Sequence, residues 1–232
     1  MNLNKIDEVY FIFNNISSQD YLTIKTLPSI FKAQKDINLI EVEGRSGFLT
    51  QDLGSYRGIV KTIECIVKDL SQADYICEWL DGGGEVVFSN EPDKVYKTVI
   101  NNQIELSMLI KTYHSFLVQF QCQPHKYSLQ NNAITLQATG TIYNSGSAIA
   151  LPIIKLFGTG SLTLTINGNL VNLTNVSEYV TINSDLMDCY KDTLLKNNDM
   201  SGEFPILEVG NNNISWTGTV SKVEITPNWR YL

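Results

Sequence analysis

The sequence predicts a mainly β protein of two domains, the first with a minor α-helical element and the second an antiparallel sandwich. Short segments of alternating apolar and polar residues recur along the chain, and only one segment has helical spacing. Composition also changes near residue 128, because residues 1–128 hold 28 charged side chains whereas residues 129–232 hold 13 and carry 14 Asn and 12 Thr. These turn formers and small polar residues are typical of an all-β domain. We therefore expect two domains, residues 1–128 and residues 129–232.

The clearest element of the first domain is a strand at residues 59–68, where apolar residues stand on both faces, as in a strand covered on both sides. A short amphipathic helix follows, because Ser71 to Asp74 have the form of a capping box and glycines 82–84 come just after the last helical turn. Pro124 is expected to end a strand and to open the domain boundary at residues 125–131. Strands are also expected at residues 9–13, 37–42, 85–88, 94–100 and 115–122.

The second domain contains a clear hairpin signal. Leu162, Leu164 and Ile166 alternate with polar residues, and Asn167-Gly168 then marks a type I′ turn. Trp216 shares a strand face with Ile214, so we expect Trp216 in the core. Other strands are expected at residues 133–138, 141–143, 149–157, 178–182, 213–216 and 222–225. Short strands at this spacing favour an antiparallel sandwich.

Charge and hydropathy exclude several classes of protein. The formal net charge is −7, which argues against a surface that neutralises phosphates, so specific binding to DNA or RNA is not expected. No apolar run reaches the ~18 residues of a membrane span, and the amino terminus lacks the pattern of a secretory signal, which predicts folding in the cytoplasm. The four cysteines have no C-x-x-C spacing, so we expect buried thiols and neither disulfides, a metal site nor a cofactor.

The candidate catalytic groups are few. The histidines are His114 and His125, and Cys122 lies three residues before the second of them. A thiol and base pair at a strand end next to a proline rarely point at one another, and no third group to orient the base is evident. A buried thiol beside a surface histidine is the favoured interpretation, so the chain is not expected to be an enzyme.

Two sets of acidic residues could be functional sites or solvated surfaces. Glu41 and Glu43 stand on one side of an extended segment, as a glycosidase pair does, but they also fit a solvated strand face. Asp185, Asp188 and Asp192 would form a stripe along a short helix and lack the alternating ligands and glycine turn of a calcium loop. Solvated acidic faces are favoured in both places.

An arginine bracketed by glycines is the remaining unusual feature. Gly44, Arg45 and Gly47 follow a predicted strand, and Arg57 lies in a second glycine-rich segment. The G-x-x-x-x-G-K-[ST] pattern of a phosphate loop is absent. Since a planar guanidinium is suited to fixing contacts between subunits, we expect these four residues at a subunit interface, with an ordinary polar loop as the alternative.

A series of fragments in both domains carries a resemblance to one family. The first domain contains LPSI (27–30), VEGRSG (42–47), YRGIV (56–60), WL with the glycine run (79–84), VFSNEPD (87–93) and FQCQP (120–124). The second contains INSDLMDCY (182–190), SGEFP (201–205), GNNNISW (210–216) and PNWR (227–230). In content and order these fragments resemble the distal tail protein (Dit) family of long-tailed, non-contractile bacteriophages.

The resemblance implies an amino-terminal, tail-tube-like β-sandwich with one α-helix and a carboxyl-terminal galectin-like β-sandwich. It further implies a homohexameric ring in the virion, at the tail tip, after synthesis in the host cytoplasm. The ring would join the tail tube protein above to the tail-associated lysin or tail-tip protein below. DNA would pass through the lumen without specific binding, as the acidic balance allows.

Two other functions remain open. The second domain would be a carbohydrate-binding module for host cell-wall glycan, with Tyr143, Tyr179 or Trp229 as an exposed platform. A receptor-binding protein is another possible partner, although a second domain of about 104 residues leaves no room for the arm with which some members of the family grip one. The histidine and arginine cluster of true galectins is missing, because residues 129–232 contain no histidine and a single arginine. The other alternative is a tail-tip enzyme that degrades peptidoglycan, which requires the catalytic groups that the sequence does not convincingly supply.

Overall fold

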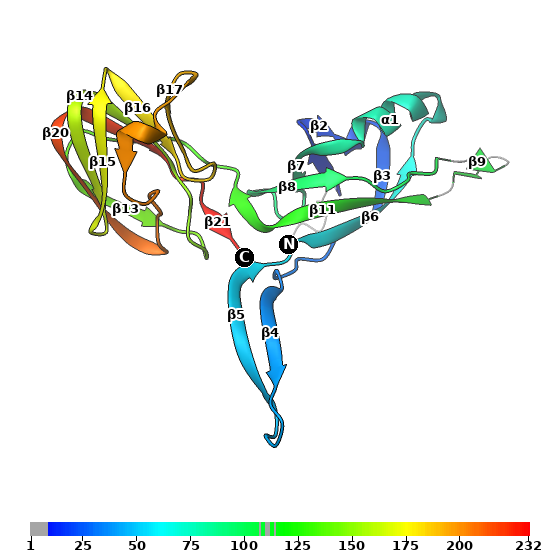
Figure 1. Ribbon diagram of the computed structural model, residues 1–232. Helices are drawn as coiled ribbons and strands as arrows, with labels where there is room; N and C mark the ends of the chain where they lie inside the picture. The colour runs from blue at the N-terminus through cyan, green and yellow to red at the C-terminus, as the bar shows by residue number, and fades with distance from the viewer. Residues whose placement is uncertain (1–8, 107, 110–111, 114) are drawn as a thin grey trace, which may run out of the picture. The chain divides into compact units, whose positions relative to one another are not determined.

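The computed structural model describes residues 9–106, 108–109, 112–113 and 115–232. Within that part of the chain the protein is mainly β, with a single α-helix, and all its strand pairs are antiparallel, which confirms the predicted fold class (Figure 1). The chain divides into two compact units, unit 1 up to Leu129 and unit 2 at Gln130–Tyr231. Each unit has its own hydrophobic core.

Unit 1 is organised around one twisted sheet with the strand order β2-β1-β7-β8-β11-β6-β3. The helix α1 contributes Ile76 and Trp79 to the core beneath this sheet, and the Trp79 ring stacks on Phe11 at 5.6 Å between ring centroids. Its elements are β1 (Phe11–Phe13), β2 (Ile16–Ser17), η1 (Ser18–Asp20), β3 (Leu22–Thr26), β4 (Lys35–Glu41), β5 (Phe48–Tyr56), β6 (Ile59–Val67), η2 (Leu70–Gln72), α1 (Ala73–Trp79), β7 (Gly82–Phe88), β8 (Lys94–Ile100), β9 (Met108–Leu109), β10 (Thr112–Tyr113) and β11 (Ser115–Ser128).

The structure corrects three sequence expectations in this unit. The strand at residues 59–68 exists as β6, but only one of its faces is buried, and Val60 on the other face is 53% exposed. The helical segment is capped by Asp69, whose carboxylate accepts from the Ser71 backbone N–H, so Ser71 is not the cap. The glycines 82–84 open strand β7.

Strand β11 does not end at Pro124 as the sequence predicted. It continues to Ser128, and its pairing with β8 shifts in register between Cys122 and Lys126. A proline has no N–H to donate to the ladder, and a register irregularity is where a strand tolerates this loss.

A buried lysine lies at the centre of unit 1. Lys61 on β6 is 1% exposed, and its ammonium sits 4.6 Å from the centre of the Tyr96 ring and 3.8 Å from a carboxylate oxygen of Glu91. Glu91 also accepts from the Tyr96 hydroxyl and from Lys126. The ammonium donates to the backbone oxygen of Ser29 at 3.1 Å. Burial lowers the pKa of Lys61, and the nearby Glu91 carboxylate opposes that shift.

Unit 2 is a sandwich in which two long strands belong to both sheets. Residues 153–157 of β14 pair with β16, whereas residues 162–166 pair with β15, and β20 follows β14 along both stretches. The elements of unit 2 are β12 (Ile134–Leu136), β13 (Gly140–Asn144), β14 (Ile153–Ile166), β15 (Asn169–Val176), β16 (Tyr179–Asn183), β17 (Asp188–Lys191), β18 (Leu194–Leu195), η3 (Asn197–Asp199), β19 (Met200–Ser201), β20 (Gly210–Thr226) and β21 (Arg230–Tyr231).

Glycines make the corner where the long strands pass from one sheet to the other. A Cβ on Gly158 would lie 2.3 Å from the Thr219 carbonyl oxygen, and one on Gly218, at φ +95°, would lie 2.6 Å from that of Ser161. The two strands expected at residues 213–216 and 222–225 are therefore one bent strand, β20.

Other expectations for unit 2 have mixed outcomes. The turn at Asn167-Gly168 has positive φ at both residues, which confirms the predicted hairpin. Trp216 packs against the core, also as predicted. The helix expected to carry Asp185, Asp188 and Asp192 is wrong, because a turn and the strand β17 occupy this stretch and Asp192 follows the strand.

We predict that Lys61→Met lowers the free energy of unfolding by about 3 kcal/mol, because it removes one of the two cations that lie beside the buried Glu91 carboxylate. Chemical denaturation followed by tryptophan fluorescence measures the change. Lys25→Met is the matched control, since Lys25 forms an exposed ion pair with Glu64 that contributes little. Equal effects of the two substitutions would contradict a structural role for the buried cluster.

Candidate functional site: the β4–β5 hairpin

All four predicted interface residues belong to one hairpin of unit 1. Gly44, Arg45 and Gly47 lie in the turn between β4 and β5, and Arg57 comes directly after β5. Both glycines have positive φ, +78° and +85°, which L side chains rarely adopt, so the turn requires them. The sequence interpretation of the whole region as a glycine-rich turn is wrong for residues 48–56, which form a strand.

Among the described residues, β4 and β5 pair only with each other. Glu41 is opposite Phe48 and Ile37 is opposite Asp52, and the two strands form a separate sheet of their own (Figure 1). The outer edges of both strands therefore present backbone N–H and C=O groups that no other strand within residues 9–106, 108–109, 112–113 and 115–232 takes up. An isolated two-stranded ribbon is only marginally stable in water, so this hairpin is an element that a partner would complete.

The hairpin carries apolar side chains on both faces. Leu39 and Phe48 are 53% and 55% exposed, and on the other face Ile40 lies directly opposite Leu49. Contiguous exposed apolar surface of this kind marks an interaction site on a soluble protein. The exposed apolar residues of the hairpin are Ile37, Leu39, Ile40, Val42, Phe48, Leu49 and Leu53.

Two ion pairs hold the base of the hairpin. Lys35 donates to Asp52 across the strands, and this contact raises the pKa of Lys35 and lowers that of Asp52. Arg57 donates to one oxygen of Asp36 from Nε at 3.0 Å and from Nη2 at 2.7 Å. The Arg57 guanidinium is thus already used inside the subunit, whereas Arg45 stands exposed at the tip.

The segment that leads into β4 is fixed to the core of unit 1. Its backbone oxygens at Pro28 and Ser29 accept from Asn90 at 3.0 Å and from the buried Lys61 at 3.1 Å. Ala33 is buried, and the Arg57 backbone N–H donates to Gln34 at 2.8 Å on the far side of the hairpin. The hairpin is therefore exposed along its length but firmly attached at its root.

The candidate catalytic groups do not converge. Cys122 is buried, and burial raises the pKa of its thiol, which is the opposite of what a nucleophile needs. The His125 ring packs edge-on against Tyr56 at 5.7 Å. His114 lies outside the described residues. Three of the four cysteines are buried as expected, but Cys77 is exposed.

The acidic candidates are likewise scattered over the surface. Glu41 and Glu43 are exposed, at the end of β4 and in the hairpin turn. Among the described residues no three His, Cys, Asp or Glu side chains lie close enough to hold a metal ion. No helix in the described part of the chain is long and apolar enough to cross a membrane.

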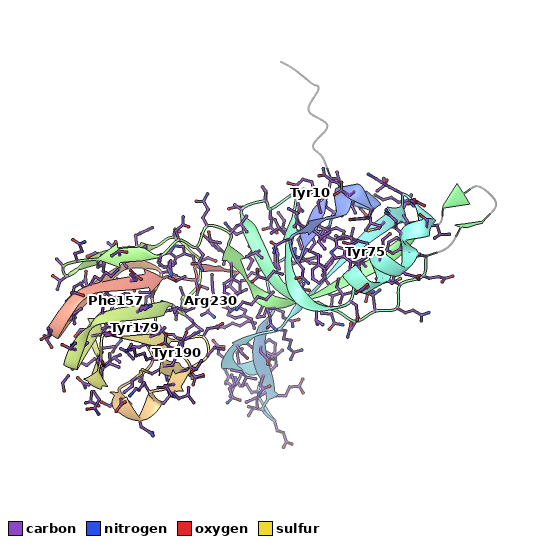
Figure 2. All side chains as sticks on the ribbon, turned by 90° about the horizontal axis from the view of Figure 1, so that it is seen from above. Tyr10, Tyr75, Phe157, Tyr179, Tyr190 and Arg230 are labelled. Atoms are coloured by element: carbon purple, nitrogen blue, oxygen red, sulfur yellow. The ribbon has the colours of Figure 1, made fainter. Side chains whose placement is uncertain are left out.

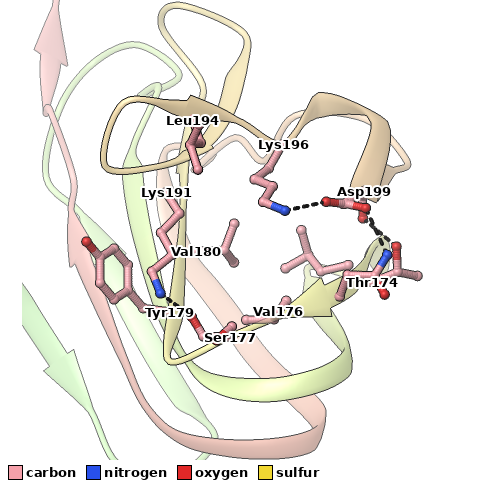
Figure 3. A pocket seen from close by; sticks show the side chains of 11 residues that line it. Thr174, Val176, Ser177, Tyr179, Val180, Lys191, Leu194, Lys196 and Asp199 are labelled. Carbon is pink, nitrogen blue, oxygen red and sulfur yellow. Dashed lines mark hydrogen bonds and ion pairs between the residues drawn. The ribbon is translucent and has the colours of Figure 1, made fainter.

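Unit 2 contains a pocket of about 190 Å³ that is lined by residues of β15, β16, β17, β18 and η3 (Figure 3). Its floor includes Val176 and Val180, and its polar groups pair with one another. Lys196 bonds Asp199 at 3.0 Å, and Lys191 donates to the Ser177 backbone oxygen at 2.8 Å. With its charges already paired and no acid and base aimed into it, the pocket lacks the features of an active site.

Comparisons with known proteins agree on the architecture. No family model and no curated protein matches the sequence. Among solved structures, the chain is similar to the SPP1 Dit (gp 19.1) protein, whose crystal structure is described as a paradigm of the hub adsorption apparatus in phages that infect Gram-positive bacteria. The match has a TM-score of 0.76 and 15% sequence identity, and it covers 97% of this chain and 99% of the other.

The chain shares the fold of SPP1 Dit. At this identity the similarity establishes the architecture, and it extends over nearly the full length of both chains. The mainly β fold expected from the sequence fragments is therefore present.

We predict that Leu39→Ser combined with Phe48→Ser weakens self-association of the protein, because it removes exposed apolar side chains without touching the core of unit 1. Sedimentation velocity over a range of concentrations measures the effect. Leu195→Ser is the control, since Leu195 is a comparably exposed leucine in unit 2. Unchanged sedimentation of the double variant would count against the hairpin as an interaction element.

Proposed function

We propose that this protein is a distal tail protein, a structural hub at the tail tip of a bacteriophage or prophage. The observation that carries the proposal is the fold shared with the SPP1 Dit protein over 97% of the chain. The ordered series of fragments that resembles the Dit family also supports it, because this resemblance lies in the sequence and not in the fold.

In this function the two domains have different tasks. Residues 1–128 form a homohexameric ring that continues the tail tube, and residues 129–232 form a galectin-like sandwich. The ring connects the tail tube protein to the tail-associated lysin or tail-tip protein. The protein is made in the host cytoplasm and resides in the virion.

Closure of a ring from identical copies needs two different, complementary surfaces on each subunit. The β4–β5 hairpin has the properties of one of them. It is rooted in the core, exposes apolar side chains on both faces, and has free backbone groups along both edges. Arg45 at its tip is placed to meet a carboxylate or a carbonyl of the next subunit.

The net charge of the chain is compatible with a ring through which DNA passes. With 24 acidic and 17 basic side chains, the protein carries a formal charge of −7. An acidic lumen repels phosphate, so DNA would pass through it without being held.

Negative-stain electron microscopy of the purified protein tests the proposal. We predict sixfold annular particles at micromolar concentration, in equilibrium with smaller species on dilution. A monodisperse monomer at every concentration that also turns over cell-wall peptidoglycan would contradict the proposed function.

The interface assignment has a separate test. Arg45→Ala is expected to shift the equilibrium from rings toward monomers, because it removes the cation at the hairpin tip. Lys222→Ala, which removes a half-buried cation of unit 2 that pairs with Glu224, is the control and leaves the rings unchanged. Rings that persist with Arg45→Ala would refute this role of Arg45 and leave the hub function standing.

A further inference from the structure

One outer face of unit 2 has an unusual chemistry. In β13, β14, β15 and β20, the residues Ile142, Leu164, Val171 and Ile214 are buried in the core. Because side chains alternate along a strand, their neighbours point to the opposite side of this sheet. We call that side the neutral face. It includes Thr141, Tyr143, Thr163, Asn172, Asn213 and Ser215.

The neutral face carries no charged side chain. Residues 140–144, 156–177 and 209–221, which include the four strand stretches behind it, contain no Asp, Glu, Lys or Arg, although 18% of the whole chain is charged. The outer face of the other sheet of unit 2 is different, with Lys155, Lys222 and Glu224 on neighbouring strands. Since solvated protein surfaces are ordinarily rich in charge, the neutrality is specific to one face.

Hydrogen bonds fix two asparagines of the neutral face in the same way. The Thr141 hydroxyl donates to Oδ1 of Asn213 at 2.9 Å, and the Thr163 hydroxyl donates to Oδ1 of Asn172 at 2.9 Å. Neither Nδ2 group makes a hydrogen bond to any described residue of the protein, so each amide keeps a donor for a ligand. The threonines hold these donors in place before any ligand arrives, which lowers the entropy cost of binding.

Tyr143 is the one aromatic platform that stays open among the three that the sequence suggested. It is 65% exposed on β13, opposite Asn211 of β20. Tyr179 lies beside Phe157 on the other outer face, and the Lys155 ammonium stands 3.8 Å from its ring centre (Figure 2). Trp229 packs against the core of unit 2. A ligand ring can therefore stack on Tyr143, at the margin of the neutral face.

We propose that the neutral face binds an uncharged polysaccharide. Amide and hydroxyl side chains both donate and accept hydrogen bonds, as sugar hydroxyls do, and Tyr143 supplies an apolar surface for a pyranose ring. A nucleic acid or another polyanion would require cations, which this face lacks. A protein partner would favour Met, Arg and several aromatic residues, whereas Ser is depleted in such interfaces.

The spacing of the two amides sets the size of the ligand. Asn172 on β15 lies opposite Thr163 of β14. Asn213 on β20 lies beside the end of β14, four residues along the strand direction from Thr163 and two strands away from Asn172. At ordinary strand geometry the two positions are about 16 Å apart. That span exceeds one sugar ring, so the ligand is an oligosaccharide or polymer and a monosaccharide binds weakly.

A glycan array probed with the full-length protein tests the proposal. The array holds uncharged oligosaccharides of one to eight rings and matched glycans that bear uronate or phosphate. We expect binding to uncharged oligosaccharides of three or more rings and no gain from added negative charge. Titration calorimetry with the best uncharged oligosaccharide then gives its affinity. The expected result does not depend on ring assembly, which electron microscopy of the same sample monitors separately.

Substitutions locate the site. Asn213→Asp and Asn172→Asp keep the oxygen that accepts from threonine but replace the free amide donor with a carboxylate, so each is expected to weaken binding at least tenfold. Tyr143→Ala is expected to do the same. Asn198→Asp, which adds the same charge at an exposed position outside the neutral face, is the control and leaves the affinity unchanged.

Three results would overturn the proposal: no binding of any uncharged oligosaccharide at millimolar concentration, binding of charged glycans alone, or wild-type affinity in both aspartate variants. Thermal unfolding of each variant confirms that unit 2 remains folded, so a loss of binding reports on the neutral face itself.

Discussion

A two-stranded ribbon cannot cover its own apolar side chains, and this constraint governs the functional part of the molecule. The other long strands of unit 1 lie in a sheet with a buried face, but β4 and β5 have only each other. Their leucines and Phe48 are exposed, and in the described part of the chain their outer edges have no strand partner. The hairpin is thus stable in isolation only through its root, and a surface from outside the subunit is what would complete it.

The attachment of the β4–β5 hairpin to the core gives the buried lysine of unit 1 a structural role. Burying an ammonium is unfavourable unless several groups compensate it, and here an aromatic ring, a carboxylate and a backbone oxygen do so together. The backbone oxygen belongs to Ser29, in the segment that leads into β4. Lys61 therefore links the core of unit 1 to the β4–β5 hairpin.

Unit 2 presents an outer sheet face without charge. The two units therefore offer surfaces of different chemistry, an apolar hairpin in unit 1 and a hydrogen-bonding face in unit 2.

Periodicity predicted most strands that have a core to face and also β4, which has none. Residues 94–100 and 59–68 and the Asn167-Gly168 turn were found from alternation and turn chemistry. Strand β5 was missed because Thr50 to Asp52 and Gly54 interrupt its apolar residues, and no core imposes alternation on a free hairpin. The burial of Lys61 could also not be predicted from the sequence, because Tyr96 and Glu91, which compensate its charge, come from other parts of the chain. For the candidate site, the glycines and arginines marked the right segment, but the apolar side chains beside them were not recognised.

Hydrogen exchange of the backbone amides in β4 and β5, measured over a range of protein concentration, tests the central claim most directly. A hairpin completed by a second copy exchanges rapidly in the dilute protein and becomes protected as the concentration rises, while the amides in the core sheet of unit 1 keep the same protection throughout. Exchange from β4 and β5 at one unchanging rate at every concentration would show that the ribbon needs no partner and would contradict the account.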